Sequence, residues 1–124
     1  MPVIAAVCWG ALGLIHLLPA LALFRSSMIS KLYGVPSGSA TFLLLHHRAA
    51  LFLCLLLVCV WAALRSEVRP LASVVVAISM ISFLWLYVAA GQPAALRQIA
   101  IADLAGLPFL VIAAWLAFAP AREG

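Results

Sequence analysis

The sequence predicts an all-α polytopic membrane protein in which a single domain, residues 1–124, forms an antiparallel bundle of four transmembrane helices. Its composition is the first reason: 69% of the residues are hydrophobic and 8% are charged. Soluble domains contain about 45–50% apolar and about 25% charged residues. The second reason is that four apolar stretches reach the roughly 20 residues that a helix needs to cross a bilayer. Backbone groups find no partners in lipid, so these stretches must be helical.

The four predicted spans cover approximately residues 2–24, 41–64, 71–90 and 99–118. The first is followed by the polar connection RSSMISKLYGVPSGSA, which has room for a short amphipathic helix around residues 28–33. The turn RSEVRP separates the second span from the third, and GQPAALRQ separates the third from the fourth. Connections this short make neighbouring helices antiparallel, which predicts an up-down-up-down bundle.

The charge pattern excludes one class of partner and favours another. Seven basic and three acidic residues give a formal charge of +4, but no clustered basic face is present, so we expect no nucleic-acid binding. The expected partner is the lipid bilayer, whose anionic surface attracts basic loops. Basic residues are equally frequent on the two sides, and the flank of the first span, Arg25 and Lys31, favours that side as cytoplasmic.

Five ionisable residues fall inside the predicted spans, where each costs about 2.5–3.5 kcal/mol on insertion scales. They are His16, His46, His47, Arg48 and Asp103. With a helical rise of about 1.5 Å per residue, all five lie roughly 6–12 Å below the side that bears the first and third connections. Three helices therefore place their costly residues at one level, whereas the opposite half of the bundle carries no ionisable side chain.

This pattern predicts a polar pocket open to one face, because a pore would need polar lining throughout. Arg48 supplies an anion-binding fork, and the predicted ligand is a small lipophilic molecule with a polar or acidic head. His16, His47 and Asp103 are the catalytic candidates, because a carboxylate can orient a histidine that moves protons. Tyr87 lies at the same level, and Gly106, one turn from Asp103, leaves space for a ligand or a close helix approach.

Several alternatives remain open at this point. Binding alone and a proton-transfer reaction such as isomerisation or hydration both fit the residues, so enzyme activity is undecided and no cofactor is specified. A proton-coupled transporter that uses Asp103 and acts as a homo-oligomer is a second hypothesis. Haem or metal binding through His16 and His47 is a third, although no metal-spacing motif is present. Arg48 and Asp103 can also form a purely structural ion pair, and His46 is expected to point away from the pocket.

The motifs IHLLP, LYG, HHRAALF and ADLAGLP resemble those of a group of short uncharacterised bacterial four-span inner-membrane proteins. The resemblance implies the same fold and a multi-pass location in the bacterial inner (plasma) membrane. It also singles out seven positions: His16, Tyr33, Gly34, His47, Arg48, Asp103 and Gly106. The ligand-binding candidates are Arg48, Tyr33, Tyr87 and Gly106. Some members of the group carry the label phosphopantetheine adenylyltransferase. That soluble α/β enzyme has a phosphate-binding histidine motif and strand–helix alternation, and this sequence has neither.

Overall fold

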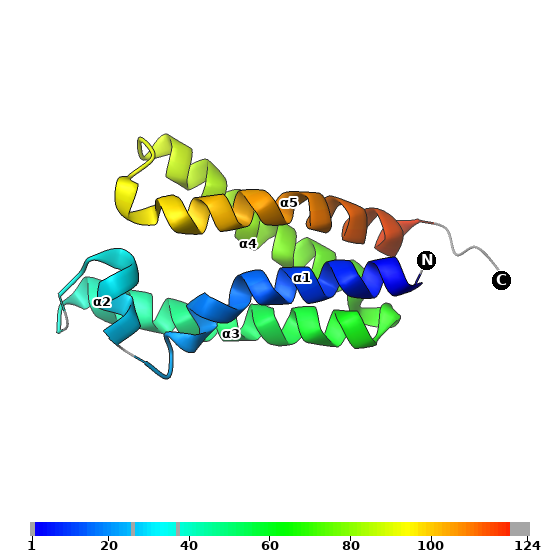
Figure 1. Cartoon of the computed structure of the whole chain (residues 1–124), viewed down its shortest axis with the longest axis horizontal. Coiled ribbons are helices and arrows are strands. Elements are labelled where there is room, and N and C mark those ends of the chain that lie inside the picture. Colours follow the sequence, from blue (N-terminus) through cyan, green and yellow to red (C-terminus); the bar gives the residue numbers. More distant parts are fainter. Residues whose placement is uncertain (1, 26, 37, 120–124) are drawn as a thin grey trace.

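The computed structural model describes residues 2–25, 27–36 and 38–119, and these residues form an all-helical bundle (Figure 1). The prediction of an all-α fold with four long apolar helices is confirmed. In chain order the elements are α1 (Pro2–Leu21), α2 (Ser27–Tyr33), α3 (Ala40–Leu64), the 3₁₀ turn η1 (Ser66–Val68), α4 (Arg69–Ala89), the 3₁₀ turn η2 (Ala94–Leu96) and α5 (Arg97–Phe118).

Four of the helices are long and apolar enough to cross a membrane, as in a multi-pass membrane protein. Large apolar side chains cover their outer faces, for example Leu14, Leu44 and Val111, which are 71%, 70% and 66% exposed. Such a surface is stable only where lipid covers it, because water would penalise each exposed apolar area. The exposed apolar faces of the structure and the apolar composition of the sequence therefore both indicate that lipid surrounds the helices.

The local sequence explains where the helices begin and end. The Ser39 hydroxyl accepts a hydrogen bond of 3.0 Å from the Phe42 N–H and caps α3. Arg69 caps the other end of α3, where its Nε donates to the Ala62 carbonyl oxygen at 2.6 Å. Between α4 and α5 the chain turns at Gly91, whose φ of 84° favours glycine.

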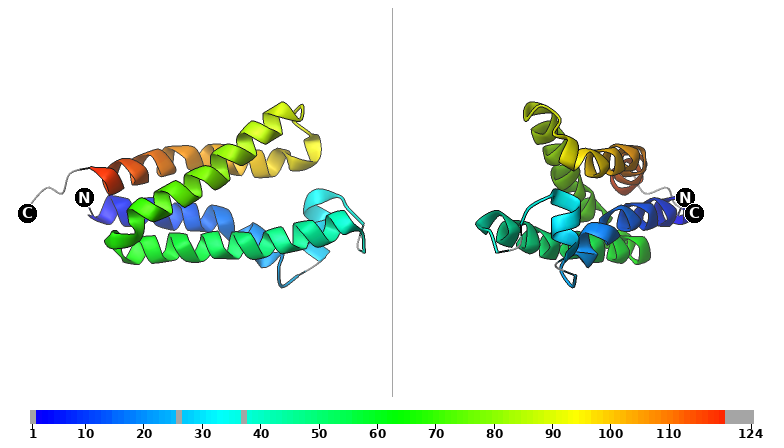
Figure 2. Two further views of the ribbon diagram at one scale, coloured as in Figure 1. Left: turned by 180° about the vertical axis from the view of Figure 1, so that it is seen from behind. Right: turned by 60° about the vertical axis from the view of Figure 1, so that its left-hand side comes forward.

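The helices do not pack in their sequence order. α1 lies between α3 and α5, and α5 packs against α4. α3 and α4 are joined by the shortest connection, yet they touch mainly near it and diverge toward the end that carries α2 (Figures 1 and 2). The expected antiparallel order is present, but one pair of sequence neighbours is splayed in half of the bundle.

Two apolar cores hold the bundle together. The larger core joins all four long helices and includes Trp9, Leu12, Cys59, Val76 and Leu110. The smaller core fixes α2 against the bundle through Ala22, Ile29, Tyr33 and Ala49. α2 is part of the connection between α1 and α3, where a short amphipathic helix around residues 28–33 was expected.

Candidate ligand-binding site between α3 and α4

Arg48 of α3 projects from the helix into a cluster of three aromatic rings. Its guanidinium carbon lies 4.6 Å from the ring centroid of Phe52, 5.3 Å from that of Phe83 and 5.9 Å from that of Tyr33. Phe52 is one helical turn along α3, Phe83 comes from α4 and Tyr33 comes from α2. The negative faces of aromatic rings attract a cation, so the cluster stabilises the Arg48 charge inside the bundle.

Tyr33 also holds Arg48 by a hydrogen bond. Nη1 of Arg48 donates to the Tyr33 hydroxyl oxygen at 3.2 Å. Burial raises the pKa of the Tyr33 phenol above its ordinary value of 10.0, and the charge and hydrogen bond of Arg48 act in the opposite direction. The phenol is therefore neutral at physiological pH and can still donate its own proton to a ligand.

The Arg48 guanidinium has no carboxylate within 4.0 Å among the described residues. The one ion pair in this part of the chain joins Arg65 and Glu67 at the surface. The structural ion pair between Arg48 and Asp103 that the sequence left open is therefore not formed. A guanidinium has five N–H donors, and only the bond to Tyr33 is made within the described part of the chain. Arg48 thus has N–H donors that bond to no other residue among those the structure describes.

A pocket of about 300 Å³ lies beside Arg48, in the half of the bundle where α3 and α4 diverge. We call it the Arg48 pocket, and its other lining residues are Leu51, Phe52 and Leu55 of α3 and Ser79, Ser82, Phe83 and Leu86 of α4. Leu51 and Leu86 are 53% and 67% exposed, so the pocket opens sideways, toward the lipid. One cation at one end of a mostly apolar pocket suits an amphiphilic molecule.

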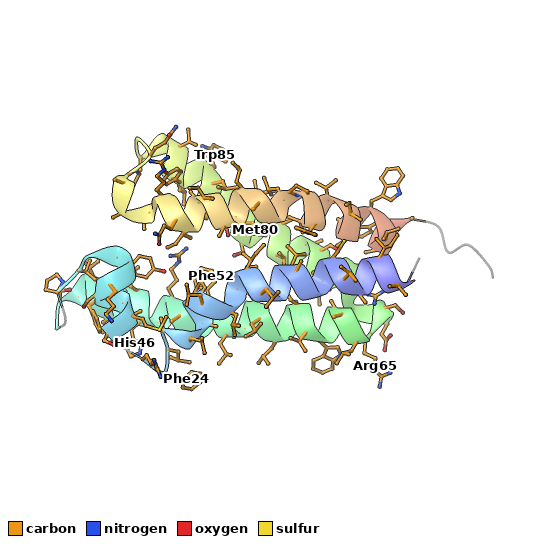
Figure 3. All side chains as sticks on the ribbon, viewed as in Figure 1. Phe24, His46, Phe52, Arg65, Met80 and Trp85 are labelled. Atoms are coloured by element: carbon orange, nitrogen blue, oxygen red, sulfur yellow. The ribbon has the colours of Figure 1, made fainter. Side chains whose placement is uncertain are left out.

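Asp103 lies in a second pocket of about 240 Å³, the Asp103 pocket, which opens between α1 and α5. Its carboxyl is buried, and Gln98 is the other side chain with a polar group in the lining. Phe52 lines both pockets and lies within the bundle in the half that carries α2 (Figure 3). The structure therefore places Arg48 and Asp103 at a common level but in two pockets with a shared aromatic wall.

His16 is fully buried and belongs to neither pocket. Its Nδ1 lies 2.7 Å from the Leu12 carbonyl oxygen, one turn back on α1. A carbonyl only accepts, so this bond places the proton on Nδ1 and leaves the lone pair on Nε2. The ring packs against Phe52 at a centroid distance of 6.0 Å. His16 thus stands behind the wall of the Arg48 pocket and does not line it.

The two neighbouring histidines of α3 have different environments. Nε2 of His46 lies 2.9 Å from the Leu23 carbonyl oxygen, so its ring fastens the first connection to α3 (Figure 3). The side chain of His47 is exposed. The structure does not bring His47 together with His16 or Asp103, and the described residues contain no group of three metal-ligating side chains.

The remaining two candidates lie at the edges of the site. The Tyr87 ring stacks on Phe83 at a centroid distance of 6.1 Å, so it supports a wall of the Arg48 pocket without lining it. A Cβ at Gly106 would lie 2.6 Å from Cδ1 of Ile15 and 2.8 Å from Cε of Met80. Gly106 therefore permits the close approach of three helices, and it leaves no space for a ligand there.

The main residues that the sequence did not single out are Phe52 and Phe83. Phe52 could have been found, because residues four apart share a helix face and it follows Arg48 by four. Phe83 could not, because its meeting with Arg48 depends on how α4 crosses the bundle.

Comparisons of the chain with protein-family models, with curated proteins and with solved structures give no match.

Proposed function

We propose that this protein binds a small lipophilic molecule with an acidic or polar head from within the bilayer. The observation that carries the proposal is Arg48, a half-buried guanidinium without a carboxylate partner among the described residues, at one end of an apolar pocket. A cation in a membrane span is costly, and the aromatic cluster offsets that cost only in part. An anionic head group would neutralise the guanidinium charge and accept hydrogen bonds from its unbonded N–H groups.

The shape of the Arg48 pocket supports a ligand that arrives through the lipid. Its rim contains the exposed side chains of Leu51 and Leu86, which an apolar tail can pass without entering water. Ser79 and Ser82 add hydroxyl groups inside the pocket, and Ser82 Oγ already donates to the Ser79 carbonyl oxygen at 3.2 Å. The proposal locates the head at Arg48 and Tyr33 and the tail between α3 and α4.

Binding is favoured over conversion. The three residues that the sequence suggested for proton transfer occupy three different environments: His16 is bonded to its own helix, His47 is exposed and Asp103 lines another pocket. General acid–base catalysis requires such groups within hydrogen-bond reach of the same reacting atoms. The location that we propose, a bacterial inner membrane, rests on the motif resemblance alone.

The test is native mass spectrometry of the purified protein after equilibration with four amphiphiles of equal chain length that carry a carboxylate, a phosphate, a hydroxyl or an amine. We expect retention of the anionic compounds and loss of that retention in Arg48→Gln. Arg97→Gln is the matched control, because Arg97 is an exposed arginine at the start of α5. Equal retention of the alcohol, or equal losses in the two variants, would contradict the proposal.

Proton-coupled transport is the second candidate, and Asp103 is the observation that favours it. This buried carboxyl makes no hydrogen bond or ion pair with any side chain that the structure describes, and it lies on the other side of Phe52 from Arg48. The corresponding measurement is pH-driven flux of an amphiphile in liposomes. Loss of flux in Asp103→Asn with binding retained would favour transport, whereas unchanged flux would exclude a role for this carboxyl.

A further inference from the structure

A second apolar pocket lies next to the Arg48 pocket, between the same two helices and nearer to their connection. It has a volume of about 410 Å³. Its lining includes Cys54, Leu57, Val58 and Trp61 of α3 and Leu71 and Val75 of α4. We call this region the distal seam. On α3, Leu55 of the Arg48 pocket precedes Val58 of the distal seam by less than one turn, and on α4 Ser79 follows Val75 by four residues.

From this adjacency we infer that the ligand is a long-chain carboxylate whose alkyl chain runs from Arg48 into the distal seam between α3 and α4. This inference rests on the proposed function, since it assumes that the head group lies at Arg48. It adds the class of the head, the course of the chain and a limit on chain length.

The charge of the head follows from the surroundings of Arg48. The lining of the Arg48 pocket contains one cation and no acidic side chain, and Tyr33 adds one neutral hydroxyl. A single guanidinium neutralises a monoanion and pairs with a carboxylate through two parallel hydrogen bonds. A dianionic phosphate would keep an unpaired charge inside the bundle, which is costly in this solvent.

The course of the chain follows from the packing of α3 and α4. The two helices diverge from their connection onward, and exposed apolar side chains border the space between them: Leu57 and Trp61 are 57% and 63% exposed, and Leu71 is 69% exposed. An alkyl chain lying there would contact protein on two sides. The gain is dispersion and packing, because lipid is as apolar as the seam.

The length limit follows from the closed end of the seam. The connection through Val68 ends the distal seam, and there Arg69 is fixed to the carbonyl oxygens of Ala62 and Ala63. From Arg48 to Val58 or Trp61 the distance along α3 is roughly 15–20 Å. An extended chain advances about 1.2 Å per bond, which corresponds to about 12–16 carbons.

The experiment uses two hexadecanoate probes in nanodiscs of neutral lipid, one with a diazirine next to the carboxylate and one with a diazirine at the chain end. We expect the first probe to label residues 51–55 and 79–86, and the second to label residues 54–61 and 68–75. Unlabelled hexadecanoate should suppress both, and Arg48→Gln should abolish both.

Two tryptophan variants separate the seam from the outer surface. Val75→Trp fills the distal seam and should remove the labelling by the chain-end probe while labelling next to the head remains. Val74→Trp is the matched control, because Val74 is 48% exposed on the neighbouring face and lines neither pocket. It should change neither pattern.

Cys54 gives a readout without any substitution, because it lines the distal seam with an exposed thiol, whereas Cys8 and Cys59 are buried. Hexadecanoate should slow the reaction of Cys54 with a lipophilic maleimide, and hexanoate should not, because its chain of about 6 Å ends before Cys54, which lies about 9 Å from Arg48 along α3. Equal protection by the two compounds would overturn the course of the chain.

The outcomes distinguish this inference from the proposal on which it rests. Labelling near Arg48 by the head probe, with the chain-end probe scattered over the lipid-facing sides of all helices, would overturn the inference and leave the proposed function standing. If unlabelled hexadecanoate suppresses the labelling by neither probe, and Arg48→Gln leaves that labelling unchanged, then both the inference and the proposed function would be overturned. Stronger competition by hexadecyl phosphate than by hexadecanoate would overturn the assignment of the carboxylate head.

Discussion

Replacing Arg48 by methionine tests whether this residue serves ligand binding or the stability of the fold. Methionine retains an unbranched apolar stem but removes the charge and the donors. The three aromatic contacts at 4.6, 5.3 and 5.9 Å contribute about 0.5–1 kcal/mol each. The hydrogen bond to Tyr33 contributes about 1–1.5 kcal/mol, because its length of 3.2 Å is long for a charged donor. The substitution therefore removes roughly 2.5–4.5 kcal/mol of favourable interactions.

The same substitution also removes a cation from a membrane span, which is worth about 2.5–3.5 kcal/mol in the opposite direction. The two effects nearly cancel, so we expect the free energy of unfolding of Arg48→Met to stay within about 1 kcal/mol of that of the native chain. Retention of anionic amphiphiles should nevertheless disappear. Unfolding in mixed micelles, followed by circular dichroism, measures the first quantity, and native mass spectrometry measures the second.

Tyr33→Phe is the control for this measurement, because it removes the hydroxyl and keeps the ring. It should lower the free energy of unfolding by about 1 kcal/mol and leave most of the binding. A loss of about 3 kcal/mol or more in Arg48→Met would refute the reasoning, since the residue would then be part of the structural framework. Full retention of the ligand by this variant would refute it as well.

Three further predictions follow from single contacts. Gly106→Ala should lower the free energy of unfolding by about 1 kcal/mol relative to Gly10→Ala, because the new methyl group would meet Ile15 and Met80 whereas the space at Gly10 is open; thermal unfolding in nanodiscs compares the two variants. His46→Ala should cost about 1 kcal/mol through the lost bond to the Leu23 carbonyl oxygen, while His47→Ala should change stability by less than about 0.5 kcal/mol because its side chain is exposed, and chemical unfolding tests both. Because burial raises the pKa of Tyr33 in the folded protein, the stability it contributes is complete below about pH 10 and declines as the pH rises through the raised value; an alkaline stability profile that is identical in Tyr33→Phe would contradict this assignment.

The sequence predicted the depth of the candidate site in the membrane, but not which side chains line it. The positions of His16, Arg48 and Asp103 along their helices predicted a common height, and in the structure each of the three lies near Phe52. Their grouping into one pocket did not follow, because height along a helix says nothing about the direction in which each side chain points. The turn of about 100° per residue separates His46, His47 and Arg48 into three environments.

The sequence by itself determined the solvent, the helix count and the antiparallel order. Those properties depend on apolar length and on short connections, and both are local. Only the tertiary structure decided that α1 lies between α3 and α5, that α4 leaves α3 open beside Arg48, and that Phe83 and Tyr33 meet the guanidinium. The reason is physical: in lipid every apolar helix face is nearly equivalent, so the partners of each helix are chosen by close contacts such as Gly106 against Ile15 and Met80.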